Sequence, residues 1–421
     1  RSADNISYYL TTEGNVMKIL TGLDIGTASV RAVVVENKGG RPVLRGAFRE
    51  VSAGVKKGAI HDLAEATSAI GKVLHEAKRV HHSALKTIYV NIGTSQTKTQ
   101  LSRGIVAVSR ADSEIYQDDI DRVEKASVQA VPTSPNRTVV HNITREFIVD
   151  GVGDITDPLE LSGSRLEVSS VIIDAFAPHV KAIIRVVELA GGHIGGIIVN
   201  PIAASRAALS KSQKELGVVL VDIGAGTTGV AIYEEQKLVS VSVLPVGAGN
   251  VTNDVAIRLK IPVAAAENLK LNYGYAIASE INIRENIDIE KFAPDMHGMI
   301  SRRLVAETME VRLAEIMDLV NTELKLSGKV GRLAGGAVFV GGGAKLPGLT
   351  ELARSELRIA TQIGCTSREG WAVESDEFAE TFEDPEFAVA LGLAMTGAEK
   401  EGWPADASPG FHKKLLRYFL P

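Results

Sequence analysis

The sequence contains one short pattern twice, about 200 residues apart. Residues 20–36 read LTGLDIGTASVRAVVVE, and residues 217–235 read GVVLVDIGAGTTGVAIYEE. Each copy has an apolar strand, then Asp-Ile-Gly, then a tip of small and hydroxyl residues, then a second apolar strand, and so predicts a β-hairpin. One such hairpin would be weak support for a site, because Asp-Gly turns are common. Two copies with matching spacing predict equivalent hairpins that act together.

The composition of the two tips predicts an anion site. Glycine and other small residues let backbone N–H groups approach an anion closely. Hydroxyl donors are added by Thr27, Ser29, Thr227 and Thr228. Asp24 and Asp222 stand where the tips begin; a carboxylate repels phosphate directly, but it can hold the water ligands of Mg²⁺. We therefore expect the two hairpins to face each other and clamp a phosphate chain.

A third, glycine-rich segment completes the predicted site. Residues 341–348 read GGGAKLPG, follow a short apolar strand and lead into a helix. Three consecutive glycines permit close approach to a flat group such as adenine and its ribose. Glu267 and Lys270 lie one helical turn apart, so both can reach one edge of a nucleoside. By itself, that pair would be interpreted as an exposed ion pair.

The remaining pattern predicts a mixed α/β chain. Helices are expected at 62–77, 179–190 and 309–324 and from Thr252, and strands at 87–92, 194–199, 239–246 and 336–340. Between about 101 and 177, strands at 104–108, 139–149 and 166–173 surround one helix at 118–131, with turn clusters between them. This stretch is interpreted as a small α+β unit inserted into a larger domain.

Composition limits the function. The 46 Lys and Arg residues against 51 Asp and Glu give a net charge of −5, which argues against a general nucleic-acid binder. A single cysteine, Cys365, excludes a disulfide framework and a multi-thiolate metal site. Apolar runs such as 195–199 are far shorter than the roughly 20 residues that cross a bilayer. These totals predict a soluble intracellular protein.

The order DIGT at 24–27, DIGAGTT at 222–228 and VGGGAKLPG at 340–348 resembles the nucleotide-binding pattern of the actin-like ATPase superfamily. Within it, residues 215–234 and 246–274, the inserted unit and the C-terminal tail resemble the FtsA family of bacterial division proteins, over essentially residues 17–420. The resemblance implies an α/β actin-like fold with two duplicated lobes around a nucleotide cleft. It also implies an inserted subdomain, 1C, in place of the 1B subdomain of actin.

The resemblance further implies a division of the chain. The expected parts are subdomain 1A at 17–100 and 178–215, 1C at 101–177, 2A at 216–252 and 331–400 with a return to 1A, 2B at 253–330, a linker at 401–409 and an amphipathic helix at 410–421. Residues 1–16 are polar and aperiodic, and are interpreted as an expression remnant or a disordered arm.

ATP and Mg²⁺ are the cofactors that the resemblance implies. With Asp24 and Asp222 holding Mg²⁺ through water, the ATP-site positions would be Asp24, Gly26, Thr27, Asp222, Gly224, Gly226, Thr227, Thr228, Gly247, Glu267, Lys270, Gly342, Gly343 and Lys345. One position departs from hydrolytic relatives, whose Glu-Pro-x-Ala-Ala connection supplies a water-orienting glutamate, because Asn200 stands there. An amide can orient a water but cannot act as a general base. We therefore expect ATP to act as a conformational ligand with at most slow hydrolysis.

The C-terminal tail predicts a membrane contact. On a helical wheel, one half of residues 410–420 carries Phe411, Leu415, Leu416, Tyr418, Phe419 and Leu420. The other half carries Lys413, Lys414 and Arg417, so the acidic total conceals a basic tip. A helix on the order of 15 Å long cannot span a bilayer, but it can lie in the interface of an anionic membrane. The alternative is a terminal helix docked on its own domain.

Partners follow from the resemblance. It implies an adaptor that polymerises, binds the C-terminal peptide of FtsZ and other division proteins, and tethers the Z ring to the cytoplasmic side of the cell membrane at the division site. Lys291, Arg302 and Arg303 in the 253–330 subdomain are candidates to meet acidic groups of that peptide, although an Arg-Arg pair is more often a solvated face. The alternatives are a pilus-assembly or cell-shape actin homologue and, with less support, an actin-fold small-molecule kinase or a heat-shock chaperone.

Overall fold

Two five-stranded sheets of the same design form the centre of the structure, a computed structural model that describes residues 18–132, 134–294, 296–372 and 376–403. The first sheet, in the order β11-β6-β1-β2-β3, is built from β1 (Ile19–Ile25), β2 (Ser29–Lys38), β3 (Arg41–Val51), β6 (Ile88–Ile92) and β11 (Ile194–Val199). The second, in the order β18-β17-β12-β13-β14, is built from β12 (Val218–Ile223), β13 (Thr228–Glu234), β14 (Lys237–Leu244), β17 (Ala337–Val340) and β18 (Thr361–Ile363). The duplication expected from the hairpins therefore extends through both sheets.

The strand directions match as well. In each sheet, the three strands that come first along the chain (β1, β2 and β3, or β12, β13 and β14) pair antiparallel, each with the next. The two later strands (β6 and β11, or β17 and β18) run parallel to the first of these. Both predicted hairpins are confirmed, and every residue of β1 and β12 is buried, as expected of strands covered on both faces. The sequence analysis predicted β14 as a strand at 239–246 but not its counterpart β3.

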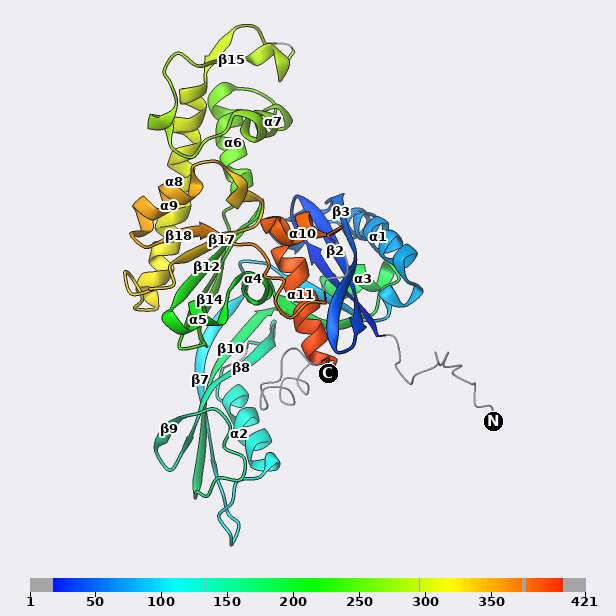
Figure 1. Cartoon of the computed structure of the whole chain (residues 1–421), viewed down its shortest axis with the longest axis vertical. Helices are drawn as coiled ribbons and strands as arrows, with labels where there is room; N and C mark the ends of the chain where they lie inside the picture. The colour runs from blue at the N-terminus through cyan, green and yellow to red at the C-terminus, as the bar shows by residue number, and fades with distance from the viewer. Residues whose placement is uncertain (1–17, 133, 295, 373–375, 404–421) are drawn as a thin grey trace, which may run out of the picture.

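Helices α1 (Leu63–Val80) and α3 (Ala177–Leu189) cover the first lobe, and α8 (Arg302–Leu326) and α9 (Leu349–Leu357) cover the second (Figure 1). The predicted helix at 62–77 is confirmed: Asp62 caps α1 by accepting the N–H of Glu65 at 2.9 Å. The predicted helix at 309–324 is confirmed as part of α8, which begins earlier, at Arg302. The apolar pattern did not reveal this start, because the helix begins with two arginines.

Two further helices cross at the centre. Helix α4 (Asn200–Ala208) follows the last strand of the first lobe, and α11 (Ala388–Lys400) follows the second lobe. An added Cβ on Gly392 of α11 would lie 1.8 Å from the carbonyl oxygen of Ala203 in α4, so the two backbones touch. Helix α4 also packs on β12 and β13, whereas α11 packs on β1 and β2. Each lobe therefore lends a helix to the other.

The inserted unit extends away from the lobes as a four-stranded antiparallel sheet in the order β7-β10-β8-β9 (Figure 1). It comprises β7 (Lys98–Ala107), α2 (Gln117–Gln129), β8 (Arg137–Val149), β9 (Val152–Ile155) and β10 (Arg165–Phe176). The predicted α+β unit is confirmed, and β9 is an addition to it. Helix α2 packs so closely that an added Cβ on Gly104 would lie 2.2 Å from the carbonyl oxygen of Val123.

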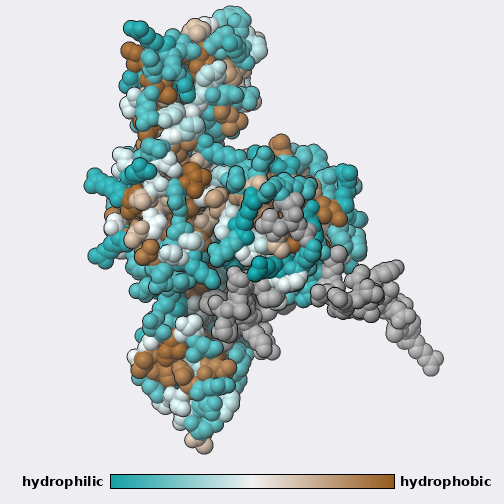
Figure 2. Space-filling view, in the orientation of Figure 1, coloured by the Kyte–Doolittle hydropathy of each residue, from teal (hydrophilic) through white to brown (hydrophobic). Residues whose placement is uncertain are grey.

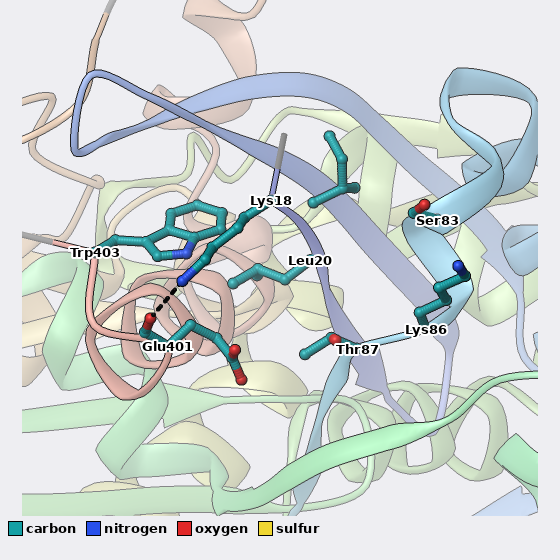
Figure 3. Close-up of a pocket in the computed structure, with 8 residues that line it drawn as sticks. Lys18, Leu20, Ser83, Lys86, Thr87, Glu401 and Trp403 are labelled. Atoms are coloured by element: carbon teal, nitrogen blue, oxygen red, sulfur yellow. Dashed lines mark hydrogen bonds between the residues drawn. The ribbon is translucent and has the colours of Figure 1, made fainter. Parts of the chain in front are cut away.

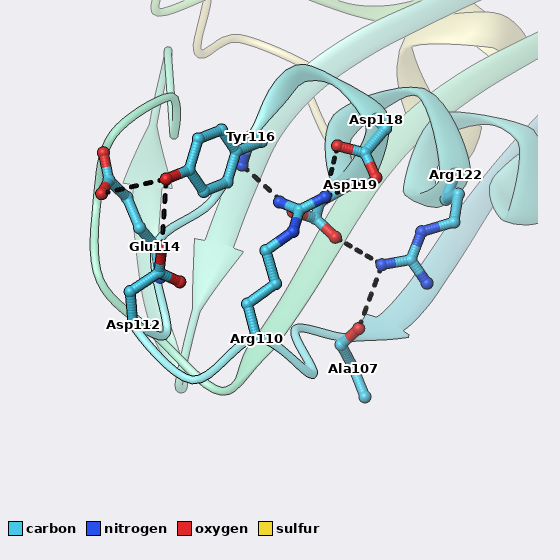
Figure 4. A network of polar contacts seen from close by, with 8 residues as sticks. All are labelled: Ala107, Arg110, Asp112, Glu114, Tyr116, Asp118, Asp119 and Arg122. Carbon is cyan, nitrogen blue, oxygen red and sulfur yellow. Dashed lines mark hydrogen bonds and ion pairs between the residues drawn. The ribbon is translucent and has the colours of Figure 1, made fainter.

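The start of α2 is held by a buried carboxylate. Asp119 is 1 % exposed, accepts the backbone N–H of Tyr116 at 3.0 Å and pairs with Arg110 at 2.9 Å and with Arg122 (Figure 4). A negative group at a helix N-terminus satisfies free N–H groups and interacts well with the helix dipole. This network of contacts thus holds the N-terminus of α2 in place within the inserted unit.

A second outlying unit caps the other lobe around α6 (Ala248–Leu259), α7 (Val263–Tyr273) and the upper part of α8 (Figure 1). Helix α6 starts before the predicted Thr252. The short elements are β4 (Val55–Lys56), β5 (Ala59–Ile60), β15 (Asn286–Asp288), β16 (Met299–Ser301), α5 (Lys211–Leu216), α10 (Ala379–Glu383) and the 3₁₀ turns η1 (His82–Leu85), η2 (Ala278–Glu280), η3 (Ile289–Lys291), η4 (Gly342–Lys345) and η5 (Pro385–Phe387).

Within the described residues, no helix combines the length and apolar character needed to cross a bilayer. The predicted tail helix at 410–421, the linker beyond residue 403 and the arm at 1–16 all lie outside the described residues.

Candidate functional site

The two hairpin tips have the same geometry. The N–H of Gly26 donates to the carbonyl of Ser29 at 3.1 Å, and the N–H of Gly224 donates to the carbonyl of Thr227 at 2.9 Å. An added Cβ would lie 2.8 Å from the Ser29 oxygen at Gly26 and 3.1 Å from the Thr227 oxygen at Gly224. A side chain at either glycine would therefore strain the turn, and this explains why the same residue stands at the start of both tips.

The tips of the two lobes meet. An added Cβ on Gly226 would lie 2.6 Å from Oγ1 of Thr27 and 3.0 Å from Cα of Lys57. Oγ1 of Thr27 also accepts the N–H of Gly58 at 3.2 Å. The expected face-to-face arrangement of the hairpins is thus present, and the site between them is formed by both lobes. Lys57 and Gly58 belong to a loop that the sequence analysis did not connect with the site.

Two buried carboxylates lie at the base of the tips. Asp24 is 5 % exposed and Asp222 is 8 % exposed. Burial raises the pKa of Asp24 to about 6, although the charge of Arg31 lowers it. Burial, together with the charge of Asp24, raises the pKa of Asp222 to about 7. The two carboxylates are close enough to disfavour each other's charge, which is the condition that a nearby cation relieves.

Asn91 links this base to the rest of the first lobe, and the sequence analysis missed it. Its Nδ2 donates to Oδ1 of Asp24 at 2.7 Å, and its Oδ1 accepts the N–H of Ile25 at 2.7 Å. Its Nδ2 also lies 3.1 Å from Oδ1 of Asn200. A polar residue inside the buried run of β6 is the signal that could have found it. Asn91 thereby connects Asp24 with Asn200, the first residue of α4.

Gly247 and the start of α6 pack on the second tip. An added Cβ on Gly247 would lie 2.4 Å from the carbonyl oxygen of Gly224, so a side chain there would push the tip away. The N–H groups of Ala248 and Gly249 donate to the carbonyls of Gly224 and Ala225, each at 2.8 Å. Thr228 has a structural part in this arrangement, because its hydroxyl donates to the carbonyl of Val246 at 2.8 Å.

Glu267 and Lys270 form more than an exposed ion pair. Their side chains meet at 2.7 Å on α7, with Lys270 only 11 % exposed. The hydroxyl of Thr252 on α6 lies 2.9 Å from Nζ of Lys270 and contacts Glu267 as well. The pair is therefore tied to the helix that begins at the second tip. Thr252 is a further residue that the sequence analysis did not place at the site.

The glycine-rich loop is the third wall. An added Cβ on Gly343 would lie 2.3 Å from Cγ2 of Ile223, and one on Gly341 would lie 2.5 Å from Oδ1 of Asp222. Gly341 also has a φ of 84°, which a residue with a side chain rarely adopts. Gly342 opens η4 on the side of Glu386, whose Oε1 would lie 3.6 Å from an added Cβ. The loop thus packs directly against the second tip.

Lys345 belongs to a charged cluster that joins the lobes. Its Nζ lies 2.8 Å from Oδ1 of Asp384 and 3.1 Å from Oε1 of Glu386. Glu386 also pairs with Arg31 and, at 3.0 Å, with Arg49, which come from β2 and β3 of the first lobe. Burial raises the pKa of Glu386, but these cations lower it below the ordinary value. A contact of Lys345 with a nucleotide would have to share its amino group with these carboxylates.

The residues present fit a nucleotide with Mg²⁺. Oγ of Ser29 is buried in the first tip and has no hydrogen-bond partner. The glycines of both tips and of the third wall let these loops pack closely together at points where a Cβ would clash. Among the described residues, no group of three or more His, Cys, Asp or Glu side chains could hold a metal ion. A cation here would therefore take most of its ligands from phosphate and water, as the pattern of Asp24 and Asp222 predicts.

The raised pKa of Asp222 gives a testable pH dependence. Without ligand, an Asp222→Asn variant should be more stable than the parent protein at pH 8, by a few kcal/mol, from a pKa shift of 3.8 to about 7. The folded state holds the proton more tightly than the unfolded state, so the stability that Asp222 contributes is present below pH 4 and is lost as the pH rises to about 7. The difference between the two proteins should grow over that range and then stay constant. Urea denaturation at several pH values measures it, and a constant difference would contradict the assignment.

The three cations suggested for a partner differ in their surroundings. Nη1 of Arg302 pairs with Glu285 at 2.7 Å, and its Nε donates to the carbonyl of Tyr273 at 3.0 Å. Arg303 makes an i,i+4 pair with Glu307 at 3.3 Å and is more exposed. Lys291 is exposed at the end of η3. Arg302 thus holds its own subdomain together, whereas Arg303 lies on a solvated face.

Comparison with known proteins places these features among relatives. The family model described as cell division protein FtsA matches residues 219–392, and the model described as the SHS2 domain inserted in FtsA matches residues 94–173. The chain is 32 % identical over 379 residues to cell division protein FtsA of Bacillus subtilis, covering 90 % of this chain and 83 % of that protein.

Solved structures share the fold at low identity. A structure titled PilM-PilN type IV pilus biogenesis complex matches with a TM-score of 0.65 and 18 % identity, over 90 % of this chain and 98 % of that chain. MreB5 of Spiroplasma citri bound to AMPPNP matches with a TM-score of 0.52 and 15 % identity, over 90 % of this chain and 95 % of that chain. At these identities the likeness shows a shared architecture: two mixed α/β lobes of the actin-like fold.

Proposed function

The chain belongs to the FtsA family of cell division proteins, and from that premise we propose that it is an ATP-binding adaptor that polymerises, binds the C-terminal peptide of FtsZ and tethers the Z ring to the membrane. The actin-like fold with an inserted SHS2 domain agrees with the fold class expected from the sequence. The alternative function in pilus assembly is less well supported, because the similarity to PilM, at 18 % identity, is a similarity of fold alone.

The observation that carries the nucleotide part is the meeting of two equivalent tips. Backbone N–H groups and hydroxyls of 26–29 and 224–227 would hold the phosphates, with Asp24 and Asp222 on the water ligands of Mg²⁺, which neutralises phosphate charge when bound. Glu267 and Lys270, tied to Thr252, and the loop at Gly342 and Gly343 would hold the nucleoside. The AMPPNP of the MreB5 structure supports a nucleotide on this fold.

Turnover should be slow, because of the residue at the water-orienting position. Asn200 begins α4 beside Asn91, and its amide lies only 2.7 Å from where a Cβ on Gly93 would stand. An amide in this place can hold a water by hydrogen bonding but cannot take its proton. We therefore propose that ATP acts mainly as a ligand that holds the two lobes together, and that it is hydrolysed slowly.

The position of the last described residues supports the tether. Trp403 is 1 % exposed and lines a cavity of about 210 Å³ with Lys18, Leu20, Lys86 and Glu401, at the end of the first sheet opposite the tips (Figure 3). Nζ of Lys18 donates to the carbonyl of Glu401 at 3.4 Å. Trp403, the last described residue, therefore lies at the end of the first lobe away from the hairpin tips. The basic amphipathic segment 410–421 would reach a membrane on that side.

We assign the partner peptide to the 253–330 subdomain, where the surface has apolar side chains beside hydrophilic ones (Figure 2). The 253–330 subdomain carries exposed apolar side chains together with cations, among them Ile257, Leu271 and Ile283. An acidic peptide would find Arg303 and Lys291 accessible there, whereas Arg302 is occupied by Glu285. An adaptor needs two separate sites, and this arrangement puts the peptide surface on the second lobe and the last described residue, Trp403, on the first.

A reconstitution with anionic vesicles and a labelled FtsZ C-terminal peptide tests both ends at once. The full chain should pellet with the vesicles and carry the peptide along. A chain truncated after Trp403, which keeps that buried side chain, should stay in the supernatant with its peptide, because it lacks the basic amphipathic segment. Arg303→Glu should pellet normally but carry several-fold less peptide. Arg79→Glu on α1 is the matched charge control, because Arg79 also makes an exposed ion pair within its own helix, with Glu76 at 2.9 Å.

Two results would contradict the proposal. Equal pelleting of the full and truncated chains would remove the tether, and undiminished peptide in the Arg303→Glu pellet would remove the assigned peptide surface. Arg302→Glu is avoided, since it breaks contacts inside the subdomain.

A further inference from the structure

The inserted unit is connected to the nucleotide site by one buried histidine. His141 lies on β8, is 5 % exposed, and its Nε2 accepts the backbone N–H of Val199 at 3.1 Å. Burial, with the charge of Lys400, lowers its pKa to about 3, so the ring is neutral. Because Nε2 accepts, the single ring proton must be on Nδ1.

The backbone of β8 is shaped for this contact. The pairing of β8 with β10 shifts register between the partners of His141 and Val139, which leaves Val140 as an extra residue on β8. A bulge of this kind bends a strand and turns the next side chain to a new direction. Val140 is itself buried in a core cluster that includes strands β1, β6 and β11 of the first lobe. The insert is thus anchored in that lobe at the point where His141 is redirected.

Val199 is the last residue of the edge strand β11, and Asn200 follows it as the first residue of α4. The neighbour of β11 within the sheet is β6, so the N–H of Val199 on its outer edge takes its acceptor from the insert. Fixing Val199 fixes the beginning of α4, because a backbone hydrogen bond restrains the adjoining peptide unit.

From Asn200 the connection continues through side chains to the site. Asn91 bridges Oδ1 of Asn200 at 3.1 Å and Oδ1 of Asp24 at 2.7 Å, and it holds the N–H of Ile25 at 2.7 Å. All these groups are buried or partly buried, where hydrogen bonds are strong and an unpaired group is costly. The path from the insert to the first tip therefore contains no solvent-exposed step.

We propose that His141 is a positioning residue through which the inserted unit and the nucleotide site control each other. A movement of β8 that withdraws the ring would release Val199, shift Asn200 and loosen Asn91 on Asp24. By the reciprocity of binding equilibria, a nucleotide that tightens the first tip must also tighten the insert, and a partner bound to the insert must change nucleotide affinity by the same factor. This inference rests on the proposed nucleotide site.

Three variants of the full-length chain test the proposal. His141→Leu keeps the bulk but removes the acceptor, whereas His141→Gln keeps a neutral acceptor. Thr144→Val removes one hydrogen bond within the insert, to Glu124 at 3.1 Å, and is the matched control. The affinity for Mg-AMPPNP is measured by calorimetry. Hydrogen exchange of peptides 197–203, 88–94 and 22–28, and of β8 itself, is measured with and without Mg-AMPPNP.

We expect His141→Leu to bind about tenfold more weakly, and to exchange at least tenfold faster in all three peptides even without nucleotide. In the parent protein Mg-AMPPNP should protect β8, and His141→Leu should lose that protection. His141→Gln should restore most of both effects, and Thr144→Val should leave them unchanged.

The proposal fails if His141→Leu matches the parent, if His141→Gln behaves like His141→Leu, or if Thr144→Val produces the same losses, since the last two results would indicate a merely structural role. Absence of Mg-AMPPNP binding to the parent protein would remove the proposed nucleotide function instead. The exchange measured without nucleotide would still show whether His141 restrains residues 22–28.

Discussion

Replacing Gly392 by alanine should lower the free energy of unfolding by about 3 kcal/mol, and valine should prevent native folding. The added Cβ would lie 1.8 Å from the carbonyl oxygen of Ala203, a backbone atom that cannot rotate away. Helix α11 would have to move off α4, and both helices cover core strands of the lobes. Thermal and urea denaturation of the purified variants measure the loss.

A matched control exists in the same lobe. Gly71 lies inside α1, and an added Cβ there would meet no atom within 4 Å. Gly71→Ala should therefore stabilise the protein by about 0.5–1 kcal/mol, through the better helix propensity of alanine. Equal changes in the two alanine variants would show that helix propensity and not the crossing decides the outcome.

Replacing Asp222 by asparagine should weaken binding of Mg-ATP about 100-fold, the scale expected when one member of a buried charge pair is lost. The amide has the shape of the carboxylate but cannot hold the water ligands of the cation as strongly. In EDTA the effect should reverse, because the variant lacks a negative charge that repels the phosphates. Calorimetric titration with ATP in Mg²⁺ and in EDTA separates the two cases.

The change of sign is the decisive part of this prediction. A variant that lost affinity equally in Mg²⁺ and EDTA would have a damaged tip and not a missing cation contact. Asp24→Asn should act in the same direction, with an additional loss of order because Asn91 donates to Asp24 at 2.7 Å. Asp318→Asn, an exchange on the exposed side of α8, should change neither titration.

Local patterns made the hairpins predictable, and distant contacts did not leave such patterns. The tips at 26–29 and 224–227 repeat the same turn in sequence and structure, since their geometry is set within a few residues. Asn91 contacts Asp24, and Glu386 contacts Lys345, across long separations in sequence. A single sequence considered by itself carries no sign of those pairings. Strand β3 was missed although its counterpart β14 was predicted, and a comparison of the two copies strand by strand would have found it.

The predicted start of helix α8 was wrong for a related reason. The start of α8 at Arg302 is fixed by Glu285 and by the carbonyl of Tyr273, neither of which belongs to the helix. The contact of Lys270 with Thr252 could not be predicted either, because Thr252 comes from α6. In each case the deciding partner lies on another element, where periodicity along the chain gives no information.

The exchange of helices at the centre has a consequence for biosynthesis. The first sheet is synthesised before the second lobe, yet part of its cover, α11, leaves the ribosome only after that lobe. Strands β1 and β2 must therefore wait, partly uncovered, while the second lobe is synthesised, a period in which exposed apolar strands favour aggregation or chaperone binding. A chain released before residue 388 would retain this defect permanently. Since residues 410–421, which we propose as the membrane contact, follow α11 in the sequence, only molecules able to close their first lobe would carry them.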